Sequence, residues 1–446
     1  MRLRERANLI QTLHLTRFSV PSLDPPSWQL LVQQAGDPHL PSLHTLTLPV
    51  TPPYPFEPLF HISPSVRKLS IFFPPWDVGS LLDGIQGLFN GICARAPNLT
   101  NLKLESESYY HRDMDSELFS PWNGLDGHHG MFDVDPHASS TFTNALPVIN
   151  ILQDLELFHM ASMNTGIASE ALLQVLSTLP RLRDVAFGID LPQQVLAAVQ
   201  PGFDHLTSLL LSNVWSTDEL RLFNSPHLRH LRIYQSLNPG TGRLDPHSCV
   251  RTLAIVGQRF QRIRSLRWTA PLEKIGVIDN NFFDTLFRPL VNLRALETLI
   301  LDFDRLGRVV LRDADLAALV ARVPQLRHLA IKYYPNGRPP LSARTLVSIA
   351  QACPALLTLQ ISGVYVSASS MREVEEYPYI EHGLQSLYLA GLECEMVGYC
   401  AMIVDVTFPN LDIAECRRRY GRMRWPCEQW GEVLDRVEKF HQGRDE

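Results

Sequence analysis

Apolar residues recur along the chain in one short pattern, L-x-x-L-x-L, in which other large apolar residues can replace leucine. Residues 323–332 show it clearly, because Leu326, Leu329 and Ile331 follow Pro324 at this spacing. The last two apolar positions alternate with other residues, as in a strand that buries one face. A strand this short cannot bury its apolar side alone, so it requires similar strands on both sides.

The pattern occurs fourteen times, and most copies start 22 to 35 residues apart. A single copy would mean little in a leucine-rich chain, but a long series at this period indicates a repeat architecture. Each copy is therefore predicted to contribute one strand. The copies begin at Ile10, Leu43, Val66, Leu99, Leu152, Leu182, Leu206, Leu228, Ile263, Leu296, Leu326, Leu356, Leu384 and Phe408.

Several connections between the copies have apolar residues at helical spacing and end at or just before a proline. Proline disfavours helical geometry in the residue before it, so the helix ends there and the next strand follows. The predicted fold class is α/β, a leucine-rich-repeat solenoid with a curved parallel sheet on the concave side and helices and loops on the convex side. The predicted helices cover residues 78–94, 169–179, 313–323 and 342–353.

The predicted domain organisation is a solenoid of about fourteen irregular repeats over residues 1–416 and a C-terminal segment over 417–446. A flexible insert at 106–146 interrupts the repeat period. The C-terminal segment starts with a basic run, interpreted as a solvated collar, with a nuclear-localisation or nucleic-acid patch as the alternative. A helix over 426–441 then places apolar residues on one stripe, as a cap for the last repeat requires. The stripe consists of Trp430, Val433, Leu434, Val437 and Phe440.

Composition and charge argue against several classes of function. The chain has 446 residues and a net charge of −6, which does not favour nucleic acid or an anionic membrane as a partner. It contains no apolar run long enough for a membrane span and no signal peptide. Seven cysteines without a C-x-x-C pair are typical of a reducing compartment. The predicted location is therefore cytoplasmic or nuclear.

Candidate catalytic chemistry is confined to the insert. Its histidines and aspartates have the composition of a metal site but not the spacing of a known one, and we interpret them as incidental residues of a loop. No catalytic residue, metal site or cofactor is predicted, and the chain is not expected to be an enzyme. An enzyme with its site in the insert is a distant alternative. The residues concerned are Asp126, His128, His129, Asp133, Asp135 and His137.

The proline-led pattern at residues 96–104 and 353–361 resembles the long leucine-rich repeats of ribonuclease-inhibitor-like proteins. Irregular repeat lengths and proline-rich connections make the chain similar to fungal F-box/leucine-rich-repeat proteins. In that family an F-box module binds a Skp1-type adaptor, and the repeats hold the substrate of a ubiquitin ligase. No F-box-like stretch precedes the first repeat, so a Skp1-type adaptor is expected only if an F-box exists upstream.

Strand alternation predicts which residues face the concave side, where we expect a protein partner. The predicted function is a non-catalytic protein-recognition solenoid that resembles the substrate-binding part of F-box/leucine-rich-repeat receptors. A scaffold or inhibitor unrelated to ubiquitin is the alternative, and ordinary solvated strand positions remain an open interpretation. The earlier repeats are expected to contribute Asn101, Lys103, Glu105, Asp154, Glu156 and Phe158. The predicted partner-binding residues are His230, Arg232, Tyr234, Arg267, Ile300, Asp302, His328, Lys332 and Tyr388.

Overall fold

The computed structural model places the described residues in two compact units. The first unit contains the described residues between 9 and 212 together with Arg221–Leu228, and the second contains Asn213–Leu220 and the described residues from 229 onward. The described residues are 9–14, 40–49, 62–73, 90–106, 152–159, 167–168, 170–189, 191, 193–214, 218–235, 244–270, 282–303, 311–333, 341–367, 379–421 and 427–445.

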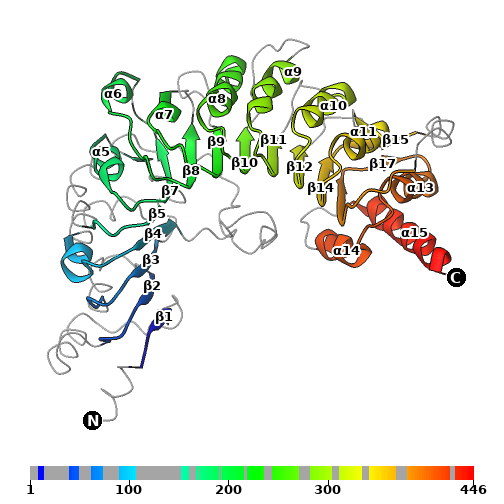
Figure 1. Ribbon diagram of the computed structural model, residues 1–446. Helices are drawn as coiled ribbons and strands as arrows, with labels where there is room; N and C mark the ends of the chain where they lie inside the picture. The colour runs from blue at the N-terminus through cyan, green and yellow to red at the C-terminus, as the bar shows by residue number, and fades with distance from the viewer. Residues whose placement is uncertain are drawn as a thin grey trace. The chain divides into compact units, whose positions relative to one another are not determined.

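The first unit is built on a parallel sheet in which each strand pairs with the strand of the next repeat. Its strand order is β1-β2-β3-β4-β5-β7-β8 (Figure 1). Strand β6 also pairs with β7. Residues 90–95 are helical, which agrees with the end of the helix predicted over 78–94. The bounds are β1 Thr12–His14, β2 Thr45–Pro49, β3 Lys68–Phe73, β4 Asn101–Ser106, β5 Leu157–His159, β6 Ile167–Ala168, α5 Glu170–Thr178, β7 Asp184–Ile189, α6 Gln193–Ala198 and β8 Ser208–Val214.

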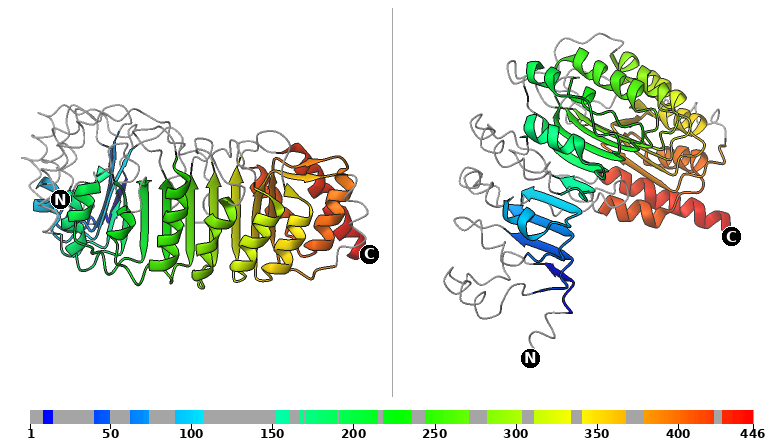
Figure 2. Two further views of the ribbon diagram at one scale, coloured as in Figure 1. Left: turned by 90° about the horizontal axis from the view of Figure 1, so that it is seen from above. Right: turned by 60° about the vertical axis from the view of Figure 1, so that its left-hand side comes forward.

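The second unit repeats this plan with more regular strands, and its helices α8 to α11 lie along one face of the sheet (Figure 2). The order is β9-β10-β11-β12-β14-β16, all parallel, and β13, β15 and β17 form a smaller parallel sheet. The bounds are α7 Asp218–Arg221, β9 His230–Gln235, α8 Pro246–Arg259, β10 Ser265–Ala270, α9 Phe282–Phe287, η4 Arg288–Asn292, β11 Thr298–Phe303, α10 Asp313–Arg322, β12 His328–Tyr333, β13 Leu341–Ser342, α11 Arg344–Ala352, β14 Thr358–Ser362, β15 Val364–Val366, β16 Ser386–Ala390, β17 Glu393–Cys394, α13 Val397–Thr407, α14 Ile413–Gly421 and α15 Glu428–Asp445.

One hydrogen-bond arrangement recurs where the chain enters each strand. The carbonyl oxygen of Arg264 accepts the N–H groups of Glu297 (2.8 Å) and Thr298 (2.9 Å) in the next repeat. The Glu297 carbonyl in turn accepts the N–H groups of Arg327 (2.8 Å) and His328 (3.0 Å). Since every buried backbone group requires a partner, this arrangement fixes the register between successive repeats. The predicted α/β leucine-rich-repeat fold is therefore confirmed.

The core lies between the sheet and the helices and consists of the apolar residues of the repeated pattern. Leu326, Leu329 and Ile331 are all fully buried, as are their equivalents in the neighbouring repeats. One polar group is built into this core: the Gln235 side chain accepts the indole N–H of Trp268 at 3.0 Å and donates to the Ser248 hydroxyl at 3.3 Å. A buried amide is tolerated there because its hydrogen bonds are satisfied.

Two glycines allow strands to continue from the long sheet of the second unit into the small one. Gly363 and Gly391 have φ angles of +70° and +62°, a left-handed conformation that residues with a Cβ rarely adopt. Gly363 separates β14 from β15 and donates its N–H to the Ala390 carbonyl at 2.7 Å. The chain thus changes direction at the same point in two successive repeats.

The copy of the pattern that starts at Leu152 forms a strand in a different frame from the predicted one. Phe158 aligns with Leu102 and Val185 of the adjacent strands and is fully buried, whereas Leu157 lies on the opposite face and is half-buried. The prediction that Phe158 faces the concave side is therefore wrong. Both frames satisfy the pattern, since Leu155, Phe158 and Met160 have the same spacing as the predicted Leu152, Leu155 and Leu157. In the observed frame the larger side chain, Phe158, occupies the core.

The fourteenth copy, predicted to form a strand from Phe408, contains the start of helix α14 instead. Asp412 donates its N–H to the Gln385 carbonyl at 2.9 Å, as a further strand would. Its carboxylate then accepts the N–H of Glu415 at 2.9 Å, which is the hydrogen bond of a helix N-cap. The Cys416 thiol accepts the N–H of Leu387 at 3.4 Å, so α14 covers the edge of β16.

The remaining predicted elements are partly within the described residues. Helices α5, α10 and α11 lie within the predicted ranges 169–179, 313–323 and 342–353. Of the predicted stripe in the C-terminal helix, Trp430, Val433, Leu434 and Val437 are buried, whereas Phe440 is exposed. The insert at 106–146, including its candidate metal ligands, lies outside the described residues apart from Ser106.

Candidate functional site: the inner face of the second sheet

The second unit gathers all nine predicted partner-binding residues on the sheet face that lies opposite helices α8 to α11, here called the inner face. Strand register arranges them in three rows, which we name the entry, middle and exit rows. The entry row is His230, Ser265, Thr298, His328, Thr358 and Ser386; the middle row is Arg232, Arg267, Ile300, Ala330, Gln360 and Tyr388; and the exit row is Tyr234, Thr269, Asp302 and Lys332.

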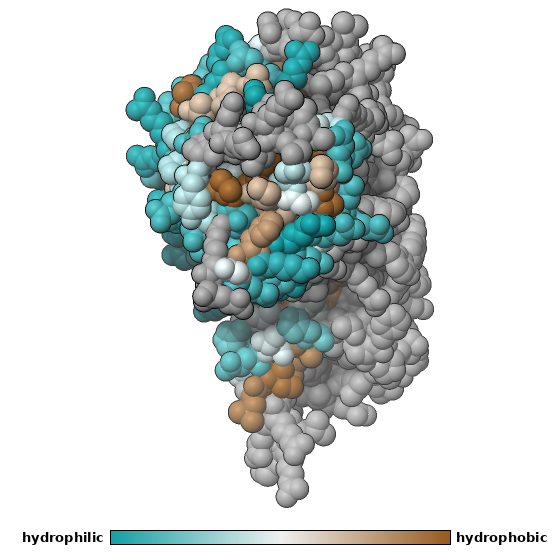
Figure 3. All heavy atoms as spheres, turned by 90° about the vertical axis from the view of Figure 1, so that its right-hand side faces the viewer, coloured by the Kyte–Doolittle hydropathy of each residue, from teal (hydrophilic) through white to brown (hydrophobic). Residues whose placement is uncertain are grey.

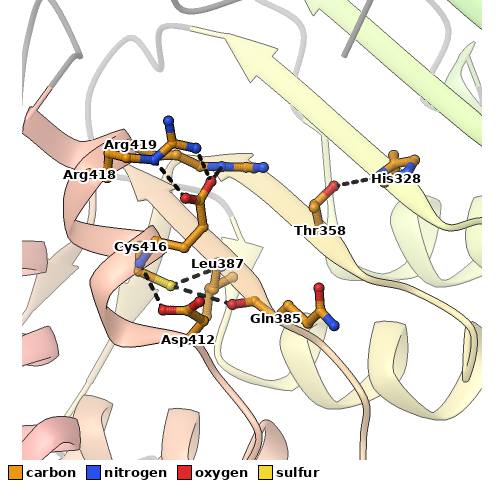
Figure 4. A network of polar contacts seen from close by, with 9 residues as sticks. His328, Thr358, Gln385, Leu387, Asp412, Cys416, Arg418 and Arg419 are labelled. Carbon is orange, nitrogen blue, oxygen red and sulfur yellow. Dashed lines mark hydrogen bonds and ion pairs between the residues drawn. The ribbon is translucent and has the colours of Figure 1, made fainter. Parts of the chain in front are cut away.

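The entry row carries two half-buried histidines. His328 and Thr358 are register partners, and the His328 Nδ1 lies 2.8 Å from the Thr358 hydroxyl (Figure 4). Burial lowers the pKa of His328, and the positive charges of Arg419 and Arg327 lower it further, partly opposed by Glu297. The imidazole is therefore neutral at physiological pH and offers one donor and one acceptor.

The middle row is more buried than strand alternation alone predicts. Arg232, Ile300 and Tyr388 are only 4%, 4% and 3% exposed, so this row offers little surface to solvent. Each side chain of this row has the entry and exit rows on either side and neighbouring strands about 4.8 Å away. The Arg232 guanidinium also lies against the Tyr234 ring, 5.0 Å from its centroid.

The exit row and its middle-row neighbours carry most of the charge on the inner face. The Arg267 Nη2 lies 3.5 Å from the Asp302 carboxylate, and Asp302 is the register partner of Lys332. Tyr234, Asp302 and Lys332 are each half-buried and thus reach the surface of the face. Within the three rows, Arg232, Arg267 and Lys332 are positive and Asp302 alone is negative. This balance favours a ligand with carboxylate groups.

Helix α14 adds basic groups near the entry row. Arg418 donates to both Glu415 carboxylate oxygens, at 2.7 and 2.8 Å, and Arg419 donates to the same carboxylate at 2.9 Å (Figure 4). These two guanidinium groups lower the pKa of Glu415, with the Arg418 hydrogen bond as the largest cause. The positive charge of Arg419 lowers the pKa of His328, so this arginine contributes to the electrostatic potential of the inner face.

Arg419 was not among the residues predicted from the sequence, because the basic run was interpreted as a solvated collar. One signal was available: Glu415 and Arg419 are four residues apart, which is the spacing of an ion pair on a helix. Arg417 of the same run lies 2.8 Å from Asp435 and 2.6 Å from Glu438, both on α15. In residues 417–419, the three arginines thus all have carboxylate partners.

In the first unit, the predicted inner-face residues are only partly placed as expected. Asn101 and Lys103 lie on the inner side of β4 and are half-buried. Asp154 and Glu156 precede β5 rather than lying in it, which corrects the prediction that they lie on the concave face of a strand. Asp154 forms an ion pair with Arg181 at 2.7 Å in the neighbouring turn.

The other candidate chemistry within the described residues is structural. Burial raises the pKa of Cys93 to about 11 and that of Cys353 to about 12, so both thiols stay protonated and act as core residues. In the part of the chain that the structure describes, no group of three or more His, Cys, Asp or Glu side chains could hold a metal ion. None of the helices described there has both the length and the apolar content of a membrane span.

Comparisons with known proteins find similarity at the level of solved structures alone. No model of a known protein family and no curated protein matches the chain. The yeast Rad7 and Elc1 complex gives a TM-score of 0.38 at 12% identity, over 84% of this chain and 88% of the other. An internalin, InlF, from Listeria monocytogenes gives 0.31 at 12% identity over 74% and 93%, and the TLR13–ssRNA13 complex gives 0.36 at 13% identity over 87% and 56%.

Proposed function

We propose that the chain is a non-catalytic recognition protein that binds a protein partner on the inner face of its second unit. The observation that supports this most directly is the arrangement of the three rows. Backbone register places Tyr234, Arg267, Asp302 and Lys332 within four adjacent strands on one face. Tyrosine and arginine are enriched at binding hot spots, and a sheet whose backbone is already ordered reduces the entropic cost of binding.

The charge on the inner face supports a partner segment that carries carboxylate groups. Within the rows, three basic residues accompany a single carboxylate, and Arg419 adds a further positive charge near His328. Planar guanidinium groups bind carboxylates through paired hydrogen bonds. The half-buried Tyr234 and Lys332 supply the contacts of the exit row, while the buried Arg232 supports Tyr234 from the middle row.

We further propose that the bound protein is the substrate of a ubiquitin ligase, because the repeat pattern resembles that of F-box/leucine-rich-repeat proteins. A scaffold or inhibitor without a link to ubiquitin is the second candidate. Co-purification of a Skp1-type adaptor with the full-length protein would favour the first, and its absence at native expression levels would favour the second. Metal analysis of the purified chain tests the distant alternative of an enzyme with its site in residues 106–146.

The test of the binding surface is affinity capture from the native source with wild-type protein and a triple variant, Tyr234→Ala, Arg267→Ala and Lys332→Ala. We expect the triple variant to lose the specific partner. A matched control carries alanine at His247, Arg251 and Gln258, which are exposed on helix α8 and so lie on the other face. Equal capture by the triple variant and the wild type, with both folded, would refute the assignment.

A further inference from the structure

The edge of the second unit at which strands β9 to β12 begin is rich in arginine. These strands are parallel and in register, so the turns that lead into them lie along one edge (Figure 2). Arg259 and Arg322 are in the last turns of helices α8 and α10, where a positive charge complements the helix dipole. Five further arginines lie outside the helices and are exposed, and we call them the basic rim. The basic rim consists of Arg229, Arg262, Arg264, Arg294 and Arg327.

Backbone hydrogen bonds fix the spacing of the rim. The Arg229 carbonyl accepts the N–H groups of Arg264 at 2.8 Å and Ser265 at 3.0 Å. The same bonds link Arg264 to Glu297 and Glu297 to Arg327. These four linked residues, at 229, 264, 297 and 327, therefore occupy one equivalent position, directly before the strand, in four successive repeats. Neighbouring strands are about 4.8 Å apart, so the sheet holds this row at a constant spacing.

The rim has little negative charge to balance it. The Arg264 Nη1 lies 3.5 Å from the Glu297 carboxylate. Within the part of the chain that the structure describes, the other four rim arginines form no ion pair. Exposed charges of one sign on adjacent strands add up to a local positive potential.

The C-terminal end of the same unit shows the opposite arrangement. Polar residues surround an apolar centre there (Figure 3), and the arginines have carboxylates beside them. Arg417 lies 2.8 Å from Asp435 and 2.6 Å from Glu438. Those charges are balanced within the fold, whereas the charges of the rim are available to a ligand.

The chemistry of the rim indicates an anionic ligand with several closely spaced acidic groups. A guanidinium group forms paired hydrogen bonds with a carboxylate or a phosphate. From β9 to β12 the rim spans three strand spacings, or about 14 Å, which is the length of about five extended residues. The net charge of −6 disfavours a long polyanion such as nucleic acid. A short acidic peptide experiences mainly the local potential, because salt screens charges farther away than about 10 Å.

We propose that the basic rim binds a segment rich in aspartate and glutamate from a partner protein. The segment lies along the edge of the sheet, across the starts of β9 to β12, and its carboxylates pair with the rim arginines. This surface is separate from the three rows of the inner face, so its ligand need not be the partner proposed for that face.

Fluorescence anisotropy with a labelled peptide of about ten glutamates tests the proposal on the full-length protein. We expect saturable binding at an ionic strength of about 0.05 M and weaker binding as salt is added. A rim variant should bind about tenfold more weakly or worse, because exposed guanidinium–carboxylate pairs are lost. It carries Arg229→Gln, Arg262→Gln, Arg294→Gln and Arg327→Gln.

The matched control loses the same charge at exposed positions outside the rim. It carries Arg251→Gln, Arg312→Gln, Arg436→Gln and Lys439→Gln. This control should bind the peptide within about twofold of the wild type, since an exposed charge acts over about 10 Å. Thermal unfolding checks that both variants are folded. If the rim variant is not folded, Arg229→Gln and Arg327→Gln are measured singly, and each should weaken binding by about two- to threefold.

Two further measurements separate this surface from the alternatives. The inner-face variant with Tyr234→Ala, Arg267→Ala and Lys332→Ala should retain the glutamate peptide. A single-stranded oligonucleotide of the same charge should bind more weakly than the peptide. Failure of the peptide to bind, equal losses in the rim and control variants, loss in the inner-face variant alone, or tighter binding of the oligonucleotide would each overturn the proposal. None of these outcomes decides whether a partner binds the inner face.

Discussion

The inner faces of the two units differ although the same repeat builds both. In the first unit, Ala186 and Leu210 are register partners on the inner side of β7 and β8, and both are buried. The corresponding register partners in the second unit, on β9 and β10, are Arg232 and Arg267. In both units the core consists of apolar residues of the repeated pattern, and the same backbone hydrogen bonds form where the chain enters each strand. The repeat therefore fixes the backbone and leaves the inner-face side chains free to specialise.

The first unit also has the less regular strands. Strands β1 and β5 have three residues each, whereas β9 to β12 have six. On the inner side of β5 and β7, the His159 Nε2 lies 3.2 Å from the carboxylate of the half-buried Asp184. Long, regular strands hold side chains in a fixed array, which a binding surface needs. The comparison thus favours the second unit as the recognition surface.

The largest expected effect tests the frame of β5 in the first unit. Phe158→Ala should lower the free energy of unfolding by about 3–5 kcal/mol, because it removes a fully buried aromatic side chain. Leu157→Ala should lower the free energy of unfolding much less, since Leu157 is half-buried on the inner side. Urea unfolding of both variants measures the difference. If Leu157→Ala were the more damaging change, the predicted frame would be right and the observed one wrong.

A buried hydrogen-bond network in the second unit should give the next largest effect. Gln235→Leu leaves the Trp268 indole N–H buried without its acceptor, at a cost of about 1–3 kcal/mol. Gln235→Glu retains an acceptor but buries a charge, so it should not restore stability. Urea unfolding of both variants against the wild type provides the measurement. A stability unchanged in Gln235→Leu would show that this contact contributes nothing.

A smaller effect should appear as a pH dependence at the last repeat of the second unit. The His382 Nδ1 accepts the N–H of Leu384 at 3.0 Å, and its Nε2 donates to the Cys353 carbonyl at 2.9 Å. The Nδ1 bond requires the neutral ring, because a protonated Nδ1 cannot accept a hydrogen bond. Burial lowers the pKa of His382 below its usual 6.5, partly opposed by the hydrogen bond to the Cys353 carbonyl. As the pH falls below 6.5, the unfolded state takes up a proton before the folded state does. Stability should therefore decrease with falling pH until the folded-state pKa is reached.

His382→Gln should be less stable than the wild type at neutral pH and should lack this part of the pH dependence. Thermal unfolding of the two proteins over the acidic and neutral range makes the comparison. All other titrating groups are the same in both proteins, so their contribution to the pH dependence cancels in the comparison. Parallel stability curves for the two proteins would contradict the assigned role of His382.

The sequence predicted the repeat because its apolar pattern maps directly onto the core, as Leu326, Leu329 and Ile331 show. It could not choose between Leu157 and Phe158, since both frames are apolar and packing decides between them. It predicted a strand where Asp412 begins a helix, because the N-cap signal of a single residue is weaker than an apolar pattern.

The placement of the nine candidate residues on one sheet face could be predicted from the sequence, but how deeply each is buried could not. Alternation placed the nine residues on one face, since register in a parallel sheet follows from the repeat. The burial of Arg232 and Tyr388 depends on neighbouring rows, and the position of Arg419 depends on how α14 packs against β16. Such tertiary relations do not appear in the spacing of residues along a chain.

The central claim is that a protein partner binds the inner face of the second unit, and site-specific photo-crosslinking tests it most directly. A benzophenone amino acid replaces Tyr234 on the inner face in one protein and Arg251 on helix α8 in the other. The account predicts that irradiation in the native cells joins a discrete protein to position 234 and not to position 251. Crosslinks at 251 alone, or the same products at both positions, would contradict it.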